Sequence, residues 1–131
     1  MASLGTKILL PHSINTVWNV IYSFDKYTQW RSDIKQMDII SVLEFTEHTK
    51  DGYVTNFKIT ELEENENLVF DVDNINLRGQ WTIHLVSKGP ATELNLRQVL
   101  NAKKIYMQPF VKNYMKCQQM MYISDLKNIL K

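Results

Sequence analysis

Apolar and polar residues alternate along the middle of this chain, and helical spacing replaces the alternation near both ends. Residues 53–62, 67–74, 79–87 and 92–100 each place apolar side chains at every second position. This period is typical of antiparallel strands with one covered face and one solvated face. Residues 6–10 and 37–46 also predict strands, and polar turns such as Asp51 and Gly52 separate the strands. We therefore expect one curved antiparallel sheet.

Two short helices are predicted directly after the first strand. Pro11 ends that strand because it cannot donate a ladder hydrogen bond, and Ser13 is a favoured N-cap residue. Asp25 is placed to cap the second helix, which we expect to end near Trp30. The apolar side chains of the first helix recur at helical spacing: Ile14, Val17, Trp18, Ile21 and Phe24.

One long helix is predicted over residues 105–130, about 39 Å in length if every residue is helical. Pro109 fits its first turn, where a missing N–H does no harm. The helix carries two neighbouring apolar stripes: Phe110, Tyr114, Cys117 and Met121 in one, and Met115, Tyr122, Leu126 and Ile129 in the other. Only the apolar face of the sheet is large enough to cover them, so we expect an α+β fold with the helix across the sheet.

The length, composition and net charge are those of an ordinary globular chain. Its 131 residues predict a single domain spanning 1–131, with 44% hydrophobic and 22% charged residues. A net charge of +1 argues against nucleic-acid binding driven by bulk charge. We expect no signal peptide and no integral membrane segment, because no apolar run approaches about 20 residues. Cys117 is the single cysteine, so no internal disulfide can form and a cytoplasmic location is expected.

Three segments carry a family resemblance. Residues 7–30, KILLPHSINTVWNVIYSFDKYTQW, combine a strand, a proline, a Val-Trp pair and a closing tryptophan. Residues 78–98, RGQWTIHLVSKGPATELNLRQ, form a late hairpin around a Gly-Pro-Ala-Thr turn, and residues 120–130, MMYISDLKNIL, end a long helix. Their order and spacing resemble the START-like, or SRPBCC, superfamily over essentially the whole chain. The resemblance implies a helix-grip fold with a hydrophobic pocket between helix and sheet, here a modest one because the chain is short.

The pocket that this resemblance implies would be lined by inward strand positions and by the helix. Tyr53 and Gln98 are polar side chains on the apolar face, suited to orienting a ligand. The alternative that these side chains simply fill the core stays open. The remaining candidates are Trp30 at the rim, the strand residues Phe57, Ile59, Phe70, Trp81, Ile83 and Leu96, and the helix residues Tyr114, Cys117 and Met121.

Three functions fit such a fold. The first is binding of a small hydrophobic or amphipathic molecule, such as a lipid, a polyketide or an aromatic compound. The second is a polyketide cyclase or dehydratase acting in the same cavity, for which Tyr53 and Glu61 are the titratable pair that alternation places together. The third is a co-chaperone-like partner-binding module with a filled core. A fold without a cavity would favour the partner-binding module. A cavity that contains an ionisable pair would favour the enzyme, and a purely apolar cavity would favour the carrier.

Other reactive side chains suggest no further chemistry. His84 lies on an outward face without a Ser/His/Asp pattern. Glu44, Glu47 and His48 lack further ligands, so they predict a solvated hairpin end and no metal site. Cys117 lies on an apolar stripe and is expected to behave as a small buried hydrophobe. The sequence implies no cofactor, and homodimerisation through a sheet edge stays open.

Overall fold

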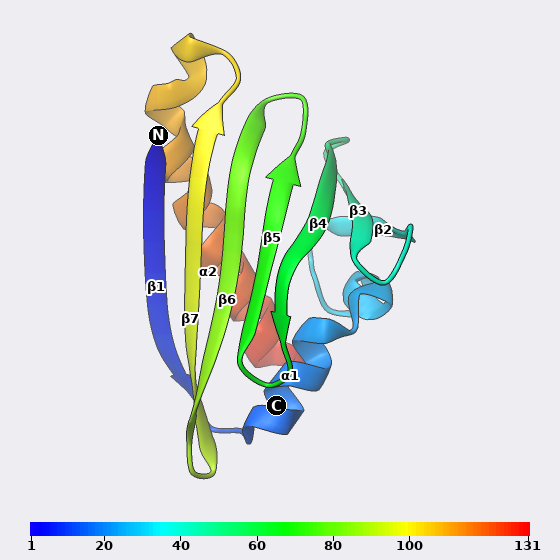
Figure 1. Cartoon of the computed structure of the whole chain (residues 1–131), viewed down its shortest axis with the longest axis vertical. Coiled ribbons are helices and arrows are strands. Elements are labelled where there is room, and N and C mark those ends of the chain that lie inside the picture. Colours follow the sequence, from blue (N-terminus) through cyan, green and yellow to red (C-terminus); the bar gives the residue numbers. More distant parts are fainter.

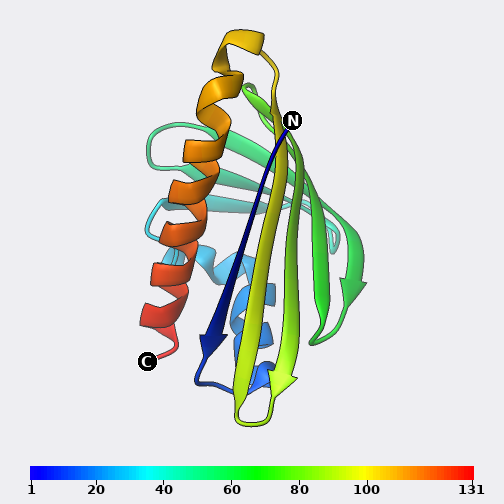
Figure 2. The same ribbon diagram turned by 90° about the vertical axis from the view of Figure 1, so that its left-hand side faces the viewer.

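Seven antiparallel strands form one curved sheet, and the long C-terminal helix lies across its concave face (Figures 1 and 2). The computed structural model describes all 131 residues. The sheet is continuous in the order β1-β7-β6-β5-β4-β3-β2. The elements are β1 (Ala2–Leu10), α1 (Ile14–Tyr22), η1 (Phe24–Gln29), β2 (Ile34–Ile39), β3 (Glu44–Thr49), β4 (Val54–Glu63), β5 (Asn67–Asp73), β6 (Leu77–Lys88), β7 (Ala91–Ala102), η2 (Ile105–Phe110) and α2 (Val111–Ile129).

The strand connections explain the shape of the sheet. Strands β2 to β7 follow one another as hairpins, and β1 pairs antiparallel with β7, so the first and last strands of the chain are neighbours. The long strands β6 and β7 pair over their whole lengths, from Leu77 with Ala102 to Lys88 with Ala91. In the side view the sheet is curved and α2 lies on its concave side (Figure 2). This strand order and the position of α2 confirm the predicted α+β helix-grip fold.

The two short helices α1 and η1 follow β1, as predicted, and lie at one end of the sheet (Figure 1). Ser13 is the N-cap of α1, and its side chain accepts a hydrogen bond from the Thr16 backbone N–H at 3.4 Å. Val17, Trp18 and Ile21 from α1 are buried in the main core. That core also contains inward strand side chains and the C-terminal half of α2, including Ile83, Leu96, Tyr122 and Leu126.

Two element predictions need correction. Residues 37–46 do not form one strand, because a turn between Ile39 and Glu44 divides them between β2 and β3. The backbone N–H groups of Ile40 and Ser41 both bond to the Glu44 carbonyl and close a hairpin there. The C-terminal helix is also shorter than predicted, since residues 105–110 form the separate 3₁₀ helix η2, with Pro109 inside it.

The buried face of α2 differs from the predicted pair of stripes. Met115, Tyr122 and Leu126 are buried as expected, but Cys117 is exposed, so the prediction that it is a buried thiol is wrong. The polar residues Gln119 and Asp125 are buried instead. Both are hydrogen-bonded to other elements, and this fixes the rotation of the helix. None of the helices has the length and hydropathy that crossing a bilayer requires.

Candidate functional site

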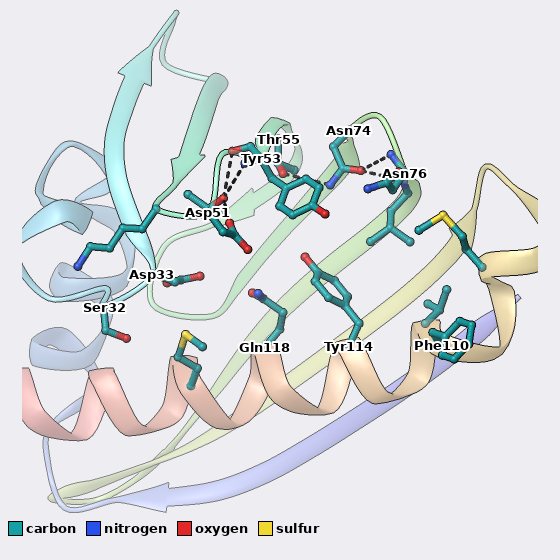
Figure 3. A pocket seen from close by; sticks show the side chains of 16 residues that line it. Ser32, Asp33, Asp51, Tyr53, Thr55, Asn74, Asn76, Phe110, Tyr114 and Gln118 are labelled. Atoms are coloured by element: carbon teal, nitrogen blue, oxygen red, sulfur yellow. Dashed lines mark hydrogen bonds between the residues drawn. The ribbon is translucent and has the colours of Figure 1, made fainter.

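A cavity of about 540 Å³ lies between the N-terminal half of α2 and the loops at one end of the sheet (Figure 3). Tyr114, Gln118 and Met121 reach it from the helix, and residues 49–55 and 74–77 supply the opposite wall. Sixteen residues line the cavity, of which seven are hydrophobic.

The cavity continues inward as a narrow extension of about 60 Å³. Trp81, Gln98 and Tyr122 line this extension but not the wide part. The two spaces are adjacent because seven residues line both: Asp33, Thr49, Thr55, Asn74, Leu77, Tyr114 and Gln118. We call the narrow extension the inner end of the cavity.

Hydrogen bonds within the loops hold the wall opposite the helix in place. The side-chain oxygen of Asn74 accepts from the backbone N–H groups of Asn76 and Leu77, both at 2.8 Å. The Asn74 amide donates to the Thr55 hydroxyl at 3.2 Å. In the neighbouring turn the Thr49 hydroxyl oxygen accepts from the Tyr53 backbone N–H at 2.9 Å. The wall is therefore preformed around the cavity.

A buried charge cluster forms the floor of the inner end. Arg31 is 7% exposed, and its Nη1 lies 3.4 Å from Oε2 of Glu47. Its Nε lies 3.5 Å from Oδ1 of Asp33, which is within ion-pair distance. The guanidinium carbon also lies over the rings of Tyr27 and Tyr122, at 5.4 Å and 5.0 Å from their centroids. One cation thus interacts with two carboxylates and two aromatic faces.

Burial and these contacts change the proton affinities in the cluster. Burial raises the pKa of Glu47; the Arg31 charge opposes the rise and Asp33 adds to it. Burial acts to lower the pKa of Arg31, but Glu47 and Asp33 outweigh it, so the net shift is upward and the guanidinium stays charged. Burial raises the pKa of Tyr122 above its usual range and that of Tyr114 to about 12. Both tyrosines therefore remain phenols at neutral pH.

Several buried polar atoms in or beside the cluster have no hydrogen-bond partner. They are Nε1 of Trp30, Nε of Arg31, Oδ1 of Asp33 and the hydroxyl of Tyr122. Arg31, Asp33 and Tyr122 all line the inner end. Buried polar groups are normally paired, and two of these atoms, Nε of Arg31 and Oδ1 of Asp33, face each other at 3.5 Å.

The structure divides the predicted pocket residues into four groups. Tyr53, Tyr114 and Met121 line the wide part, while Phe57, Trp81 and Gln98 line the inner end, together with Tyr114. Cys117 lines neither space. The other predicted residues pack in or against the main core: Trp30, Ile59, Phe70, Ile83 and Leu96.

The predicted titratable pair of Tyr53 and Glu61 does not form in the cavity. Tyr53 lines the wide part, but Glu61 is exposed and lines neither space. A register shift in β4 between Ile59 and Glu61 breaks the alternation on which the prediction relied.

Sequence reasoning missed the charge cluster. Glu47 was expected at a solvated hairpin end, but it is 7% exposed and paired with Arg31. One signal was present, because Glu47 is two positions from the core residue Phe45 and so shares its face. Nearby, His48 pairs with Asp38 at 2.6 Å, and no group of three His, Cys, Asp or Glu side chains could hold a metal ion.

Solved structures with little sequence identity share this fold. A START superfamily protein from Mycobacterium smegmatis has a TM-score of 0.88 at 16% identity, covering 96% of this chain and 94% of that chain. The Zhui aromatase/cyclase from a Streptomyces species has a TM-score of 0.88 at 6% identity, with coverages of 97% and 92%. A conserved protein from Geobacillus kaustophilus has a TM-score of 0.84 at 11% identity, with coverages of 97% and 93%.

Sequence comparison adds nothing to this likeness, since no family model and no curated protein matches the chain. At such identities the structural likeness establishes the fold alone. That fold is the START-like helix-grip fold, as the sequence predicted.

Proposed function

We propose that the protein binds a small amphipathic molecule in the cavity between the sheet and α2. The observation that carries this proposal is the cavity itself, whose volume of about 540 Å³ lies within the range of small-molecule sites. Its mixed lining, with seven hydrophobic residues of sixteen, suits a ligand with both apolar and polar parts. Tyr53, Tyr114 and Met121 would contact its outer part, and Phe57, Trp81 and Gln98 its inner part.

This cavity supports a carrier or receptor for a small molecule over a partner-binding module with a filled core. Lipids, polyketides and aromatic compounds remain the ligand classes that we expect. A cytoplasmic location agrees with the single cysteine and stays a prediction.

A second candidate function is an enzyme of the cyclase type. The observation in its favour is the buried cluster at the inner end, where Glu47 has a raised pKa beside Arg31 and Tyr122 is a buried phenol. Titratable groups perturbed by burial and by a specific charge are common at catalytic sites. A carboxyl and a phenol within one cavity could exchange protons with a bound carbonyl compound.

The first experiment is native mass spectrometry of freshly purified protein, followed by extraction and identification of any bound compound. A stoichiometric bound amphiphile would support the proposal. Binding of the uncharged dye Nile red would then be measured for the wild type and for Gln118→Phe, which places a ring in the cavity. We expect the variant to bind the dye at least tenfold more weakly.

Cys117→Phe is the matched control, because it adds a ring one residue away on the same helix but outside the cavity. We expect its Nile red affinity to equal that of the wild type. The proposal is wrong if the purified protein carries no ligand and binds no dye, or if both variants bind the dye as the wild type does.

A further inference from the structure

The charges that line the cavity do not favour an anionic ligand. The cationic lining residues are Arg31 and Lys50, and the anionic ones are Asp33, Glu47 and Asp51. Two cations against three anions give a formal charge of −1. Lys50 and Asp51 are exposed at the wide part, where water screens their charges. The buried charges of the inner end therefore decide which polar group can enter it.

At the inner end the cation is already engaged. Arg31 lies 3.4 Å from Glu47 and 3.5 Å from Asp33, and its guanidinium lies over the rings of Tyr27 and Tyr122. A carboxylate or phosphate group would have to compete with two resident carboxylates for this one guanidinium. With Glu47 protonated, Arg31 and Asp33 sum to zero charge and still pair with each other, so the inner end offers an anion no net positive charge. Like charges in a partly desolvated site are strongly unfavourable.

The carboxylate that faces the cavity points to the complementary ligand chemistry. Oδ1 of Asp33 faces Nε of Arg31, but the Asp33 side chain is 16% exposed, so part of its carboxylate is open to the cavity as a hydrogen-bond acceptor. Asp33 lines both the wide part and the inner end, and in Figure 3 it lies across the cavity from Tyr114 and Gln118. A ligand hydroxyl, phenol or ammonium group could donate a hydrogen bond to the Asp33 carboxylate from within the cavity.

We propose that the inner end selects ligands whose polar terminus is a hydrogen-bond donor, such as a hydroxyl, a phenol or an ammonium group, and rejects carboxylate and phosphate termini. This inference rests on the proposed binding function and specifies its ligand class. Asp33 supplies the acceptor, Arg31 is unavailable to anions because Asp33 and Glu47 engage it, and the apolar body of the ligand fills the wide part.

The test uses four probes that share one ring system: naphthalen-2-ol, 2-(aminomethyl)naphthalene, naphthalene-2-carboxylate and 2-methylnaphthalene. Their dissociation constants for the wild-type protein would be measured at pH 7.5 by equilibrium dialysis. We expect the alcohol and the amine to bind at least tenfold more tightly than 2-methylnaphthalene. We expect the carboxylate to bind at least tenfold more weakly than the alcohol.

A charge-neutralising pair of variants assigns the effect to the inner end. Asp33→Asn should reduce the preference for the alcohol over the carboxylate by about tenfold. Asp71→Asn removes the same charge from an exposed position that lines neither space, and it should leave the preference within about twofold of the wild type. If Asp33→Asn does not fold, the wild-type series still decides, because tight carboxylate binding alone overturns the inference.

The outcomes separate the two proposals. Binding of Nile red and 2-methylnaphthalene with no preference for donor groups, or with tighter carboxylate binding, would overturn this inference and leave the binding function intact. An unchanged preference in Asp33→Asn would also overturn it. Failure of all four probes and of Nile red would reject the binding function together with this inference.

Discussion

Glu47 is a carboxylate that the fold buries almost completely, at 7% exposure, beside Arg31 and Asp33. Burial raises its pKa, the Arg31 charge opposes the rise, and Asp33 adds to it. An acid whose pKa is higher in the folded chain than in the unfolded chain binds its proton more tightly after folding. The free energy of unfolding therefore increases as the pH falls through the raised pKa, and this gain is lost as the pH rises again.

Glu47→Gln removes this titration while keeping a side chain of similar size. We expect the unfolding free energy of the wild type, minus that of the variant, to increase as the pH is lowered from about 8 to about 5. Each tenfold gain in proton binding on folding corresponds to about 1.4 kcal/mol. Urea unfolding of both proteins at each pH measures the difference. A flat difference would show that burial and the neighbouring charges cancel at Glu47, and a difference that decreases toward acid pH would show that Arg31 lowers its pKa.

At this scale the sequence predicted the apolar part of the site better than its charged part. Trp81, Phe57 and Gln98 were placed inward because alternation within a strand determines the face of each residue. Arg31 and Asp33 lie just outside β2, where no period indicates a direction. Only the folded chain brings Glu47 from β3 against Arg31, sixteen residues earlier.

Among the elements, the pairing of β6 with β7 depends on Gly79. A Cβ atom at this position would lie 1.9 Å from the Val99 carbonyl oxygen and 2.9 Å from the Leu100 Cα. Both obstacles belong to the backbone of β7 and cannot rotate away. The two strands approach one another too closely here for any side chain.

We expect Gly79→Ala to destabilise the fold by about 3 kcal/mol or more, at the upper end of the usual cost of overpacking. Guanidinium unfolding of the purified variant measures this loss. Gly5→Ala is the matched control, because its Cβ would meet nothing nearer than the Leu96 carbonyl oxygen at 3.6 Å. We expect the control to remain within about 0.5 kcal/mol of the wild type. Equal stabilities for the two variants would mean that β6 and β7 separate readily.

Element types were easier to predict than element ends. The strands from β4 to β7 were each found within about two residues because their alternation is regular. The hairpin between β2 and β3 was missed because its tip is apolar, with Ile40 and Val42 exposed there, so the run looked like a continuous strand. The α2 boundary was missed because residues 105–110 have helical composition but form a 3₁₀ turn.

For the whole molecule, buried polar side chains attach α2 to the rest of the fold at two positions, Gln119 and Asp125. Gln119 bonds to the Leu4 carbonyl and to the Gln98 side chain, which attaches the helix to β1 and β7. Asp125 accepts hydrogen bonds from the backbone N–H and the hydroxyl of Ser32, at 2.8 Å and 2.9 Å. Ser32 lies between Arg31 and Asp33, so this second attachment positions the charged floor of the inner end against the helix.

Asp125→Ala should therefore affect both stability and ligand selection. Loss of two hydrogen bonds to a charged acceptor should lower the unfolding free energy by about 1–3 kcal/mol. Because the 31–33 segment is then less firmly held, we expect affinity for naphthalen-2-ol to fall at least threefold, while that for 2-methylnaphthalene falls less. Equilibrium dialysis and urea unfolding measure the two effects.

Two further variants test this explanation. Asp125→Asn keeps an oxygen acceptor and should recover most of the affinity for naphthalen-2-ol, whereas Ser124→Ala, at the exposed neighbouring position, should match the wild type. Equal losses of affinity for both probes in Asp125→Ala would mean that the whole cavity has changed shape. In that case α2 itself, and not the 31–33 segment, would depend on Asp125 for its position over the sheet.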